Sequence, residues 1–192
     1  MWDISEIEKY IKDNIKESRY KHTLGVIETA KKLANINGVD ENKAHLAALM
    51  HDSAKNMPSE KMIEILNEEN IKLDLVSKES PQILHGKVGA IIAKKVFEIE
   101  DEDILNAIEY HTTGRSNMST LEKIVYIADY IEPNRNYPGV DELREITFED
   151  LDKGVLKGLD NTLIFVIKEE NLIHPLTIEA RNFMLLEVKT KQ

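Results

Sequence analysis

The stretch Leu46-Ala47-Ala48-Leu49-Met50-His51-Asp52-Ser53-Ala54-Lys55 places an imidazole and a carboxylate side by side at the end of an apolar helical run. Both groups bind divalent metals. Lys55 follows Asp52 by three residues and His51 by four, so on a helix it projects from roughly the same face. The stretch predicts a metal-binding pair with a phosphate-binding cation beside it, although a His-Asp pair alone also arises by chance.

Composition describes a globular chain of 192 residues, with 42% hydrophobic and 31% charged residues. The net charge of −10 argues against broad attachment to nucleic acid or to anionic lipid. The chain has no cysteine, which excludes disulfides, thiolate zinc sites and cysteine nucleophiles. The acidic N-terminus lacks the pattern of a secretory signal, and apolar runs such as 163–167 are too short to span a bilayer. We therefore expect a cytoplasmic protein that acts on a small molecule, with no nucleic-acid or membrane partner.

Helical spacing of apolar residues dominates the chain, and alternation typical of strands is hard to find. The fold class is therefore predicted as all-α, a compact multi-helix bundle in a single domain over 1–192. The metal-site core is expected at about 19–135 and C-terminal packing helices at about 148–190. Helices are expected at 5–15, 17–37, from 40 to before Pro58, from 58, from 85, and at 101–111, 119–129, 148–170 and 178–188.

Two segments between these helices are expected to be irregular. Residues 67–80 are polar and are predicted as a long surface loop or lid, and Pro138-Gly139 marks a turn in a 134–140 loop. Gly86 and Gly89, three residues apart, would let another backbone approach closely.

The candidate ligands share one placement. His51-Asp52, His111 and Asp129 each fall in or near the last turn of a predicted helix. The C-terminal end of a helix carries partial negative charge and favours a cation. Several such ends meeting at one point would reinforce the charges of the ligands.

The order of His22, His51-Asp52 and Asp129 resembles the H…HD…D pattern of the HD superfamily of helical metal-dependent phosphohydrolases. His85 and His111, between the dyad and the last aspartate, resemble the version that holds two metals. The phrases that carry a closer resemblance, to the bacterial YqeK family, lie within about 19–135, at 19–23, 51–55, 84–86, 111–114 and 128–135.

This resemblance implies symmetrical bis(5′-nucleosyl)-tetraphosphatase activity, which cuts diadenosine tetraphosphate into two ADP at a di-iron centre. It also implies a ligand set in which Asp52 bridges the two metals. One metal would take His22, His51, Asp52 and Asp129, and the second would take His85 and His111 with Asp52. Independently of family, four imidazoles and two carboxylates without sulfur suit iron or manganese, with other divalent metals open. The nucleophile would be a hydroxide activated by the two metals.

Three residues are candidates for catalysis, namely Asp52, Lys55 and Arg135. Lys55 and Arg135 are expected to contact phosphate, since a planar guanidinium can grip two oxygens. The same entrance is predicted to contain Thr113, Gly114 and Arg115.

Each assignment has a plainer alternative. Lys55 could be a favourable last-turn cation of its helix. Lys21, Arg115 and Glu132 are interpreted as solvated or capping charges, although Glu132, three residues from Asp129, could instead orient a metal-bound water. His45 is interpreted as structural because it lies off the face of His51, and His174 is left outside the site.

Two other functions stay open on the sequence. The chain could be another HD-type nucleotide phosphohydrolase, acting on nucleoside monophosphates, deoxynucleoside triphosphates or a signalling nucleotide. It could also be a metal- or nucleotide-binding module without turnover. The sequence does not assign the residues that line a nucleoside pocket. It is compatible with a homodimer.

Overall fold

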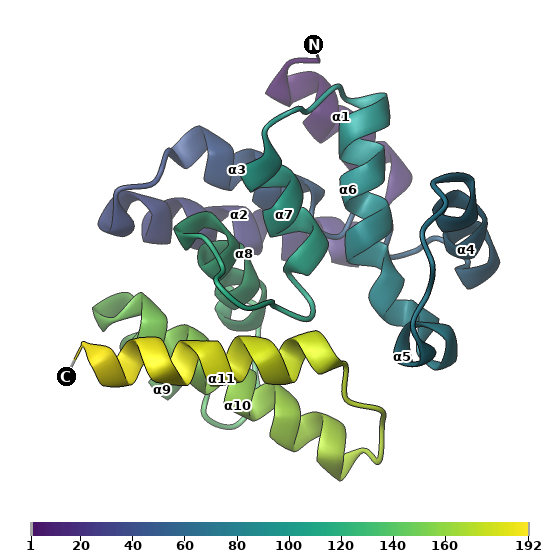
Figure 1. Cartoon of the computed structure of the whole chain (residues 1–192). Coiled ribbons are helices and arrows are strands. Elements are labelled where there is room, and N and C mark those ends of the chain that lie inside the picture. The colour runs from purple at the N-terminus through teal and green to yellow at the C-terminus, as the bar shows by residue number, and fades with distance from the viewer. Residues whose placement is uncertain (1, 192) are drawn as a thin grey trace.

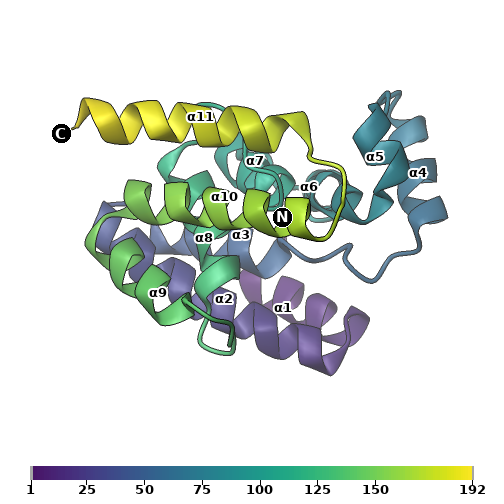
Figure 2. The ribbon, with the colours of Figure 1, turned by 90° about the horizontal axis from the view of Figure 1, so that it is seen from below.

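Every regular element in the computed structural model, which describes residues 2–191, is a helix (Figures 1 and 2). The all-α prediction is confirmed. In chain order the elements are α1 (Ile4–Asn14), α2 (Glu17–Asn37), α3 (Glu41–Met50), α4 (Ser59–Glu68), α5 (Leu75–Glu79), the 3-10 turn η1 (Pro81–Leu84), α6 (His85–Val96), α7 (Glu102–Tyr110), α8 (Thr120–Ile131), α9 (Val140–Glu149), α10 (Leu151–Lys168) and α11 (Pro175–Thr190).

Capping residues set several of these boundaries. Ser119 forms a capping box with Glu122 at the start of α8, so two backbone donors that the helix itself cannot satisfy find side-chain partners. Asp3 does the same at the start of α1. Gly38 ends α2 in the left-handed region at φ 70°, a conformation that costs glycine little. The predicted capping box at the start of α8 and the predicted glycine at the end of α2 are confirmed.

The site is held by helices that meet around one core. α2 packs along α3 and α8, α7 lies between α6 and α8, and α10 covers the other side of α8. Figure 1 shows α10 and α11 side by side along one face of the bundle, with α4 and α5 set off beyond α6. One cluster of buried side chains draws on α1 to α3 and α6 to α11 and includes Ile7, Leu33, Leu49, Ile124, Leu159 and Met184. A second, smaller cluster packs α4 against the start of α6 and consists of Ala54, Met62, Leu66, Leu84 and Val88.

Three segments differ from their predictions. The helix expected from 40 to before Pro58 is wrong at its end, because α3 ends at Met50 and residues 51–56 form turns. The 67–80 stretch is not one long loop, because α4 continues to Glu68 and the short α5 begins after Asp74, whose carboxylate accepts from the backbone N–H of Ser77. The expected 148–170 helix is also wrong at its start. The chain instead forms α9, breaks at Asp150 and continues as α10.

Within residues 2–191, helices lack the combination of length and apolar character that crossing a bilayer demands.

Candidate metal centre

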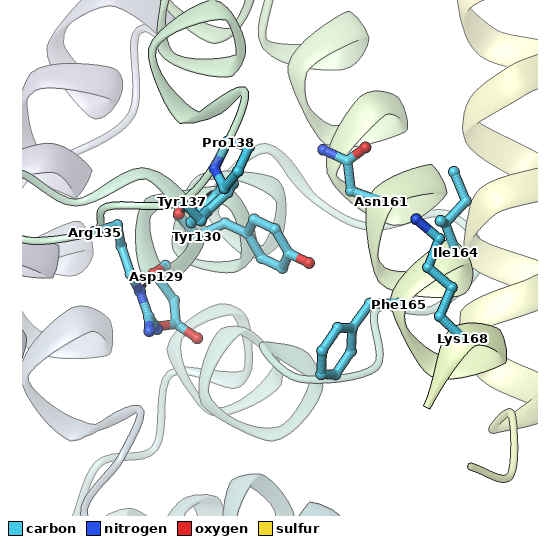
Figure 3. Close-up of a pocket in the computed structure, with 9 residues that line it drawn as sticks. All are labelled: Asp129, Tyr130, Arg135, Tyr137, Pro138, Asn161, Ile164, Phe165 and Lys168. Atoms are coloured by element: carbon cyan, nitrogen blue, oxygen red, sulfur yellow. Dashed lines mark hydrogen bonds and ion pairs between the residues drawn. The ribbon is translucent and has the colours of Figure 1, made fainter. Parts of the chain in front are cut away.

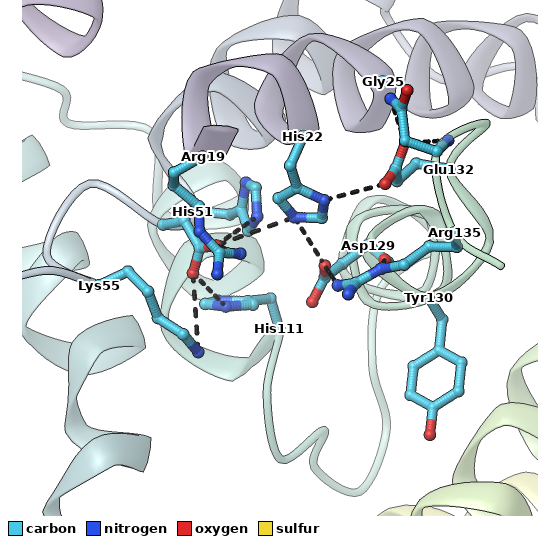
Figure 4. A network of polar contacts seen from close by, with 12 residues as sticks. Arg19, His22, Gly25, His51, Lys55, His111, Asp129, Tyr130, Glu132 and Arg135 are labelled. Atoms are coloured by element: carbon cyan, nitrogen blue, oxygen red, sulfur yellow. Dashed lines mark hydrogen bonds and ion pairs between the residues drawn. The ribbon is translucent and has the colours of Figure 1, made fainter. Parts of the chain in front are cut away.

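The six predicted ligands come from five helices or the residues that end them, and they meet at one centre. Figure 4 labels four of them, His22, His51, His111 and Asp129. His22 lies in the second turn of α2, and His51 caps the C-terminus of α3 with Asp52 next to it. His85 is the first residue of α6. The remaining two are His111, which caps the C-terminus of α7, and Asp129, in the last turn of α8. The predicted placement of ligands at helix ends is therefore found in the fold.

Asp52 lies between two groups of imidazoles. Its Oδ2 atom is 3.8 Å from Nε2 of His22 and 3.4 Å from Nε2 of His51. Its Oδ1 atom is 3.1 Å from Nε2 of His85 and 3.8 Å from Nε2 of His111. Each carboxylate oxygen thus faces its own pair of ring nitrogens.

Asp129 completes the first of these groups. Its Oδ1 atom lies 3.0 Å from Nε2 of His22. Two sets of three ligand atoms lie within 4.8 Å of one another: His22 with His51 and Asp129, and His51 with Asp52 and His111. His51 belongs to both sets, so the two halves of the centre are contiguous.

Backbone contacts fix the tautomer of three of the histidines. Each donates from Nδ1 to a carbonyl oxygen three residues earlier in the chain, which can only accept. The neutral ring therefore carries its hydrogen on Nδ1 and turns an Nε2 lone pair to the centre, as metal-ligating histidines do. The pairs are His51 with Ala48 at 2.6 Å, His85 with Gln82 at 2.7 Å, and His111 with Ile108 at 2.7 Å.

The Nε2 lone pairs that face the centre have too few hydrogens or cations to pair with. Nε2 of His85 and Nε2 of His111 are 3.0 Å apart, and neither carries a hydrogen to donate. Nε2 of His22 and Nε2 of His51 are buried without a hydrogen-bond partner. Burial lowers the pKa of His85 to about 4, so near neutral pH a proton on that ring does not supply the missing charge. Burial would also lower the pKa of His51, but the carboxylate of Asp52 outweighs burial and raises it, so this ring can take a proton that a divalent ion would displace. A mixed nitrogen and oxygen donor set with unpaired inward lone pairs fits divalent metal ions.

Positive side chains stand around the two carboxylates. Arg19 donates to Oδ2 of Asp52 at 2.8 Å, and Arg135 donates to both the carboxylate and the carbonyl oxygen of Asp129, at 2.6 and 2.8 Å. Burial alone would raise the pKa of Asp52, but the positive charge of protonated His51 and hydrogen bonds with the neighbouring imidazoles outweigh burial and hold this pKa well below its usual range. The pKa of Asp129 is lowered in the same way, and its contact with His22 contributes most to the lowering. Both groups are therefore carboxylates near neutral pH.

Lys55 reaches the other edge of the centre. Its Nζ is 3.2 Å from Nε2 of His85 and 4.0 Å from Oδ1 of Asp52. The side chain is about one-third exposed, so it meets both the buried ligands and solvent. Lys55 and Arg135 accordingly flank opposite halves of the ligand cluster.

Glu132 differs from its prediction as a solvated charge. Only 2% of it is exposed, and its Oε1 accepts from Nδ1 of His22 at 3.1 Å. Its Oε2 accepts from the backbone N–H of Asn134, which is the capping role that the sequence allowed. A Cβ at position 25 would lie 2.3 Å from Oε2, so Gly25 makes room for this carboxylate. The sequence signal was a glycine one turn after His22 on the same face of α2.

A model of the HD domain matches residues 19–134, which is more than half of the chain. This chain belongs to the HD family. A Bacillus subtilis protein named symmetrical bis(5′-nucleosyl)-tetraphosphatase is 42% identical over 175 residues, which cover 91% of this chain and 94% of that protein. A Halalkalibacterium halodurans protein of the same name is 44% identical over 179 residues, covering 93% and 95%.

A solved structure resembles this HD protein over almost its whole length. It is described as a predicted HD superfamily hydrolase involved in NAD metabolism from Clostridium acetobutylicum, and its identity to this chain is 52% with a TM-score of 0.94. The match covers 97% of this chain and 99% of that one. The predicted resemblance to the HD superfamily and the predicted fold class are both confirmed.

The predicted entrance residues of the HD site have separate surroundings. Thr113 lines a small pocket of about 120 Å³, and Gly114 adopts φ 64° where a Cβ would lie 3.0 Å from Ala180 of α11. Arg115 makes two hydrogen bonds to the buried Glu122, at 2.6 and 2.9 Å, so it is an ion-paired side chain and not the solvated or capping charge considered for it.

Thr112 was not singled out from the sequence, but its hydroxyl contacts two of the candidate ligands. Its Oγ1 is 3.1 Å from Nε2 of His111 and 3.3 Å from Nε2 of His85. A hydroxyl can donate to either lone pair. Its position next to His111 in the chain was the only signal available.

The two histidines left outside the site have structural contacts. His45 pairs with Glu8 across α3 and α1, with Nε2 and Oε1 2.9 Å apart. His174 caps the N-terminus of α11 and lies 3.4 Å from Asp74. The structural interpretation of His45 is confirmed.

A pocket of about 610 Å³ opens next to Asp129 and Arg135 (Figure 3). Its lining is mostly apolar and comes from the C-terminal end of α8, the loop that follows it, and α10. The other lining residues are Tyr130, Tyr137, Pro138, Asn161, Ile164, Phe165 and Lys168.

Proposed function

We propose that this HD protein is a symmetrical bis(5′-nucleosyl)-tetraphosphatase, which hydrolyses the central anhydride of diadenosine tetraphosphate. Water adds to one of the two central phosphorus atoms, the bridging oxygen leaves with the other half, and two ADP result. Relatives with this name are more than 40% identical and align with this chain over more than nine-tenths of their own length. The alternative HD activities and the module without turnover have no comparable support.

The observation that carries the proposal is the position of Asp52 between two groups of imidazole lone pairs. We infer that two divalent ions are held here, one by His22, His51, Asp52 and Asp129, the other by His85, His111 and Asp52. Iron is the proposed metal, because imidazole and carboxylate donors without sulfur suit it. When bound, such ions neutralise phosphate oxygens and make water acidic enough to attack at neutral pH.

The surrounding side chains orient the substrate in this proposal. Arg135 is held by Asp129 at the edge of the large pocket and presents a guanidinium to phosphate oxygens. Lys55, on the opposite edge, neutralises the charge that develops on the departing ADP. Thr113, Gly114 and Arg115 lie farther along the chain segment that borders this edge, and their contact with substrate stays a prediction.

Glu132 has a positioning role in the same scheme. By accepting from Nδ1 of His22, it holds that ring with Nε2 turned to the centre. Glu132 is almost fully buried, and its carboxylate is enclosed by His22, Asn134 and Gly25. It is therefore not placed to act as a base on a water molecule from solvent.

The net charge of −10 supports a small-molecule substrate over nucleic acid or an anionic membrane, and we place the reaction in the cytoplasm. A polyanion would approach through the local positive charge of Arg19, Lys55 and Arg135.

Product identity tests the proposed function. Iron-loaded protein is mixed with diadenosine tetraphosphate in ¹⁸O-labelled water, and the nucleotides are separated and weighed. The expected product is ADP alone, with the label in the terminal phosphate of half of the molecules. AMP with ATP, or no turnover by metal-loaded protein, would overturn the proposal. Faster turnover of a nucleoside monophosphate or triphosphate in a parallel panel would favour the other HD activities.

A further inference from the structure

The large pocket next to the candidate metal centre is chemically divided along its length (Figure 3). At one end Arg135 and Asp129 bring charge from the ligand cluster. At the other, Phe165 and Ile164 of α10 present apolar side chains that are more than half exposed. Tyr130 points its ring into the space between these ends, as Figure 3 shows. A ligand with an anionic group toward Arg135 and a flat, apolar group toward Tyr130 and Phe165 fits this lining, and Lys168 adds a cation on the α10 side.

A nucleoside diphosphate has this character. The pocket volume of about 610 Å³ lies within the usual range for small-molecule sites. Bases stack on aromatic side chains with little regard to sequence, because every base has a π-face. Asn161 adds an amide, which both donates and accepts and can bond the edge of a base.

Tyr130 and Tyr137 make a firm wall for such a ligand. Their rings meet edge to face with centroids 5.9 Å apart, and the hydroxyl of Tyr137 donates to the carbonyl oxygen of Tyr130 at 3.0 Å. Thr162 of α10 donates to the hydroxyl of Tyr130 at 3.3 Å. Phe165, on the opposite wall, is 59% exposed and is therefore free to move against a ligand.

We propose that this pocket binds one nucleoside of the substrate, with the base against Tyr130 and Phe165 and the phosphates toward Arg135. This inference rests on the proposed function and adds the residues that select the nucleoside. It also orients the substrate, with the base away from the metal centre and the phosphates toward it, because the charged end of the pocket adjoins Asp129.

A second pocket, lined in part by α6 and α7, is much smaller. Its volume is about 120 Å³, below the range for small-molecule sites, and it is lined by Lys87, Tyr110 and Thr113 among others. It cannot enclose a second nucleoside.

The test separates base recognition from phosphate recognition. Phe165→Ala should weaken binding of ADP to the metal-loaded protein about tenfold, as loss of one stacking partner does. Binding of inorganic pyrophosphate, which has no base, should be unchanged. Ile167→Ala is the matched control, because Ile167 is on the same helix, is 61% exposed and is not among the residues lining the pocket. Phe165→Trp should restore the affinity for ADP.

Titration calorimetry gives the affinity and the stoichiometry together, and it needs no turnover. One ADP per chain is expected at this pocket, and no ADP binding to the metal-loaded wild type would overturn its assignment. Equal ADP affinity in Phe165→Ala and the wild type would overturn the assignment of the pocket, as would a parallel loss of pyrophosphate binding. A protein that binds ADP in this way but does not cleave diadenosine tetraphosphate would refute only the proposed function.

Discussion

At the scale of single residues, Asp52 has the most demanding position in the molecule. It is 3% exposed, and both of its oxygens face imidazole nitrogens. Burial of a carboxylate among apolar helices is costly unless cations compensate for it. Arg19 supplies one such cation, and the proposed metals supply the rest. His85, by contrast, faces only the Oδ1 side of Asp52.

This difference predicts unequal effects of two substitutions on metal content. Asp52→Ala should lose both metals, because the shared ligand is removed. His85→Ala should retain about one metal ion per chain, since the ligands of the other site are intact. Elemental analysis of each purified variant measures this, with circular dichroism to establish that the fold is kept. His45→Ala, remote from the cluster, should match the wild type. Retention of two metals by Asp52→Ala would contradict the shared role of Asp52.

At the scale of elements, close helix crossings bring the ligands together. A Cβ at Gly86 would lie 2.6 Å from the carbonyl oxygen of Glu109, so this glycine lets α6 approach the end of α7. That approach is what places His85 against His111. The spacing of Gly86 and Gly89 predicted such an approach, and the structure identifies the partner.

The elements also explain where prediction from sequence succeeds and fails. The start of α8 was predictable because Ser119 and Glu122 are a local signal four residues long. α9 was missed because it begins at Gly139, without a side-chain cap. Arg144 of α9 instead bonds carbonyl oxygens at the end of α8, a contact more than ten residues away in the chain. In the same way, the ligand types could be predicted from their order, but the burial of Glu132 depends on a contact 110 residues away.

A matched pair of glycines in α10 tests the importance of close crossings for stability. A Cβ at Gly154 would lie 2.7 Å from the Cα of Thr147 in α9, and backbone cannot give way easily. At Gly158 the nearest atom is the end of the flexible Ile127 side chain, at 2.8 Å. Gly154→Ala should therefore lower the free energy of unfolding by at least about 2 kcal/mol. Gly158→Ala should cost less, because alanine favours a helix over glycine by about 1 kcal/mol. Urea denaturation measures both, and equal losses would contradict this reading of the α9–α10 crossing.

At the scale of the whole molecule, α10 and α11 join the pocket to the metal-binding half. Lys123 of α8 is buried and donates to Asp152 of α10 at 2.9 Å and to Glu187 of α11 at 2.8 Å. The same α10 carries the far wall of the nucleoside pocket. One buried cation therefore connects the helix of Asp129 to both C-terminal helices.

The pH dependence of stability tests this connection. Burial would raise the pKa of Asp152, but hydrogen bonds from Lys191 and Lys123 outweigh burial and lower it. Because the folded pKa lies below the unfolded value near 3.9, the stabilisation is fully present above that value and is lost as pH falls through the folded pKa. Asp152→Ala should reduce the free energy of unfolding at pH 7 by about 1.5–3 kcal/mol, the usual range for hydrogen bonds to charged groups.

The deficit of Asp152→Ala should stay constant from about pH 7 to pH 5 and shrink below about pH 4, as the wild-type carboxyl becomes protonated. Urea denaturation across this range, down to the lowest pH at which both proteins are folded, measures the deficit. Glu145→Ala, which removes an exposed carboxylate of α9, should stay within about 0.5 kcal/mol of the wild type. A deficit that does not narrow at low pH would show that Asp152 acts through packing alone, and the buried Lys123 would then not be what joins the two halves.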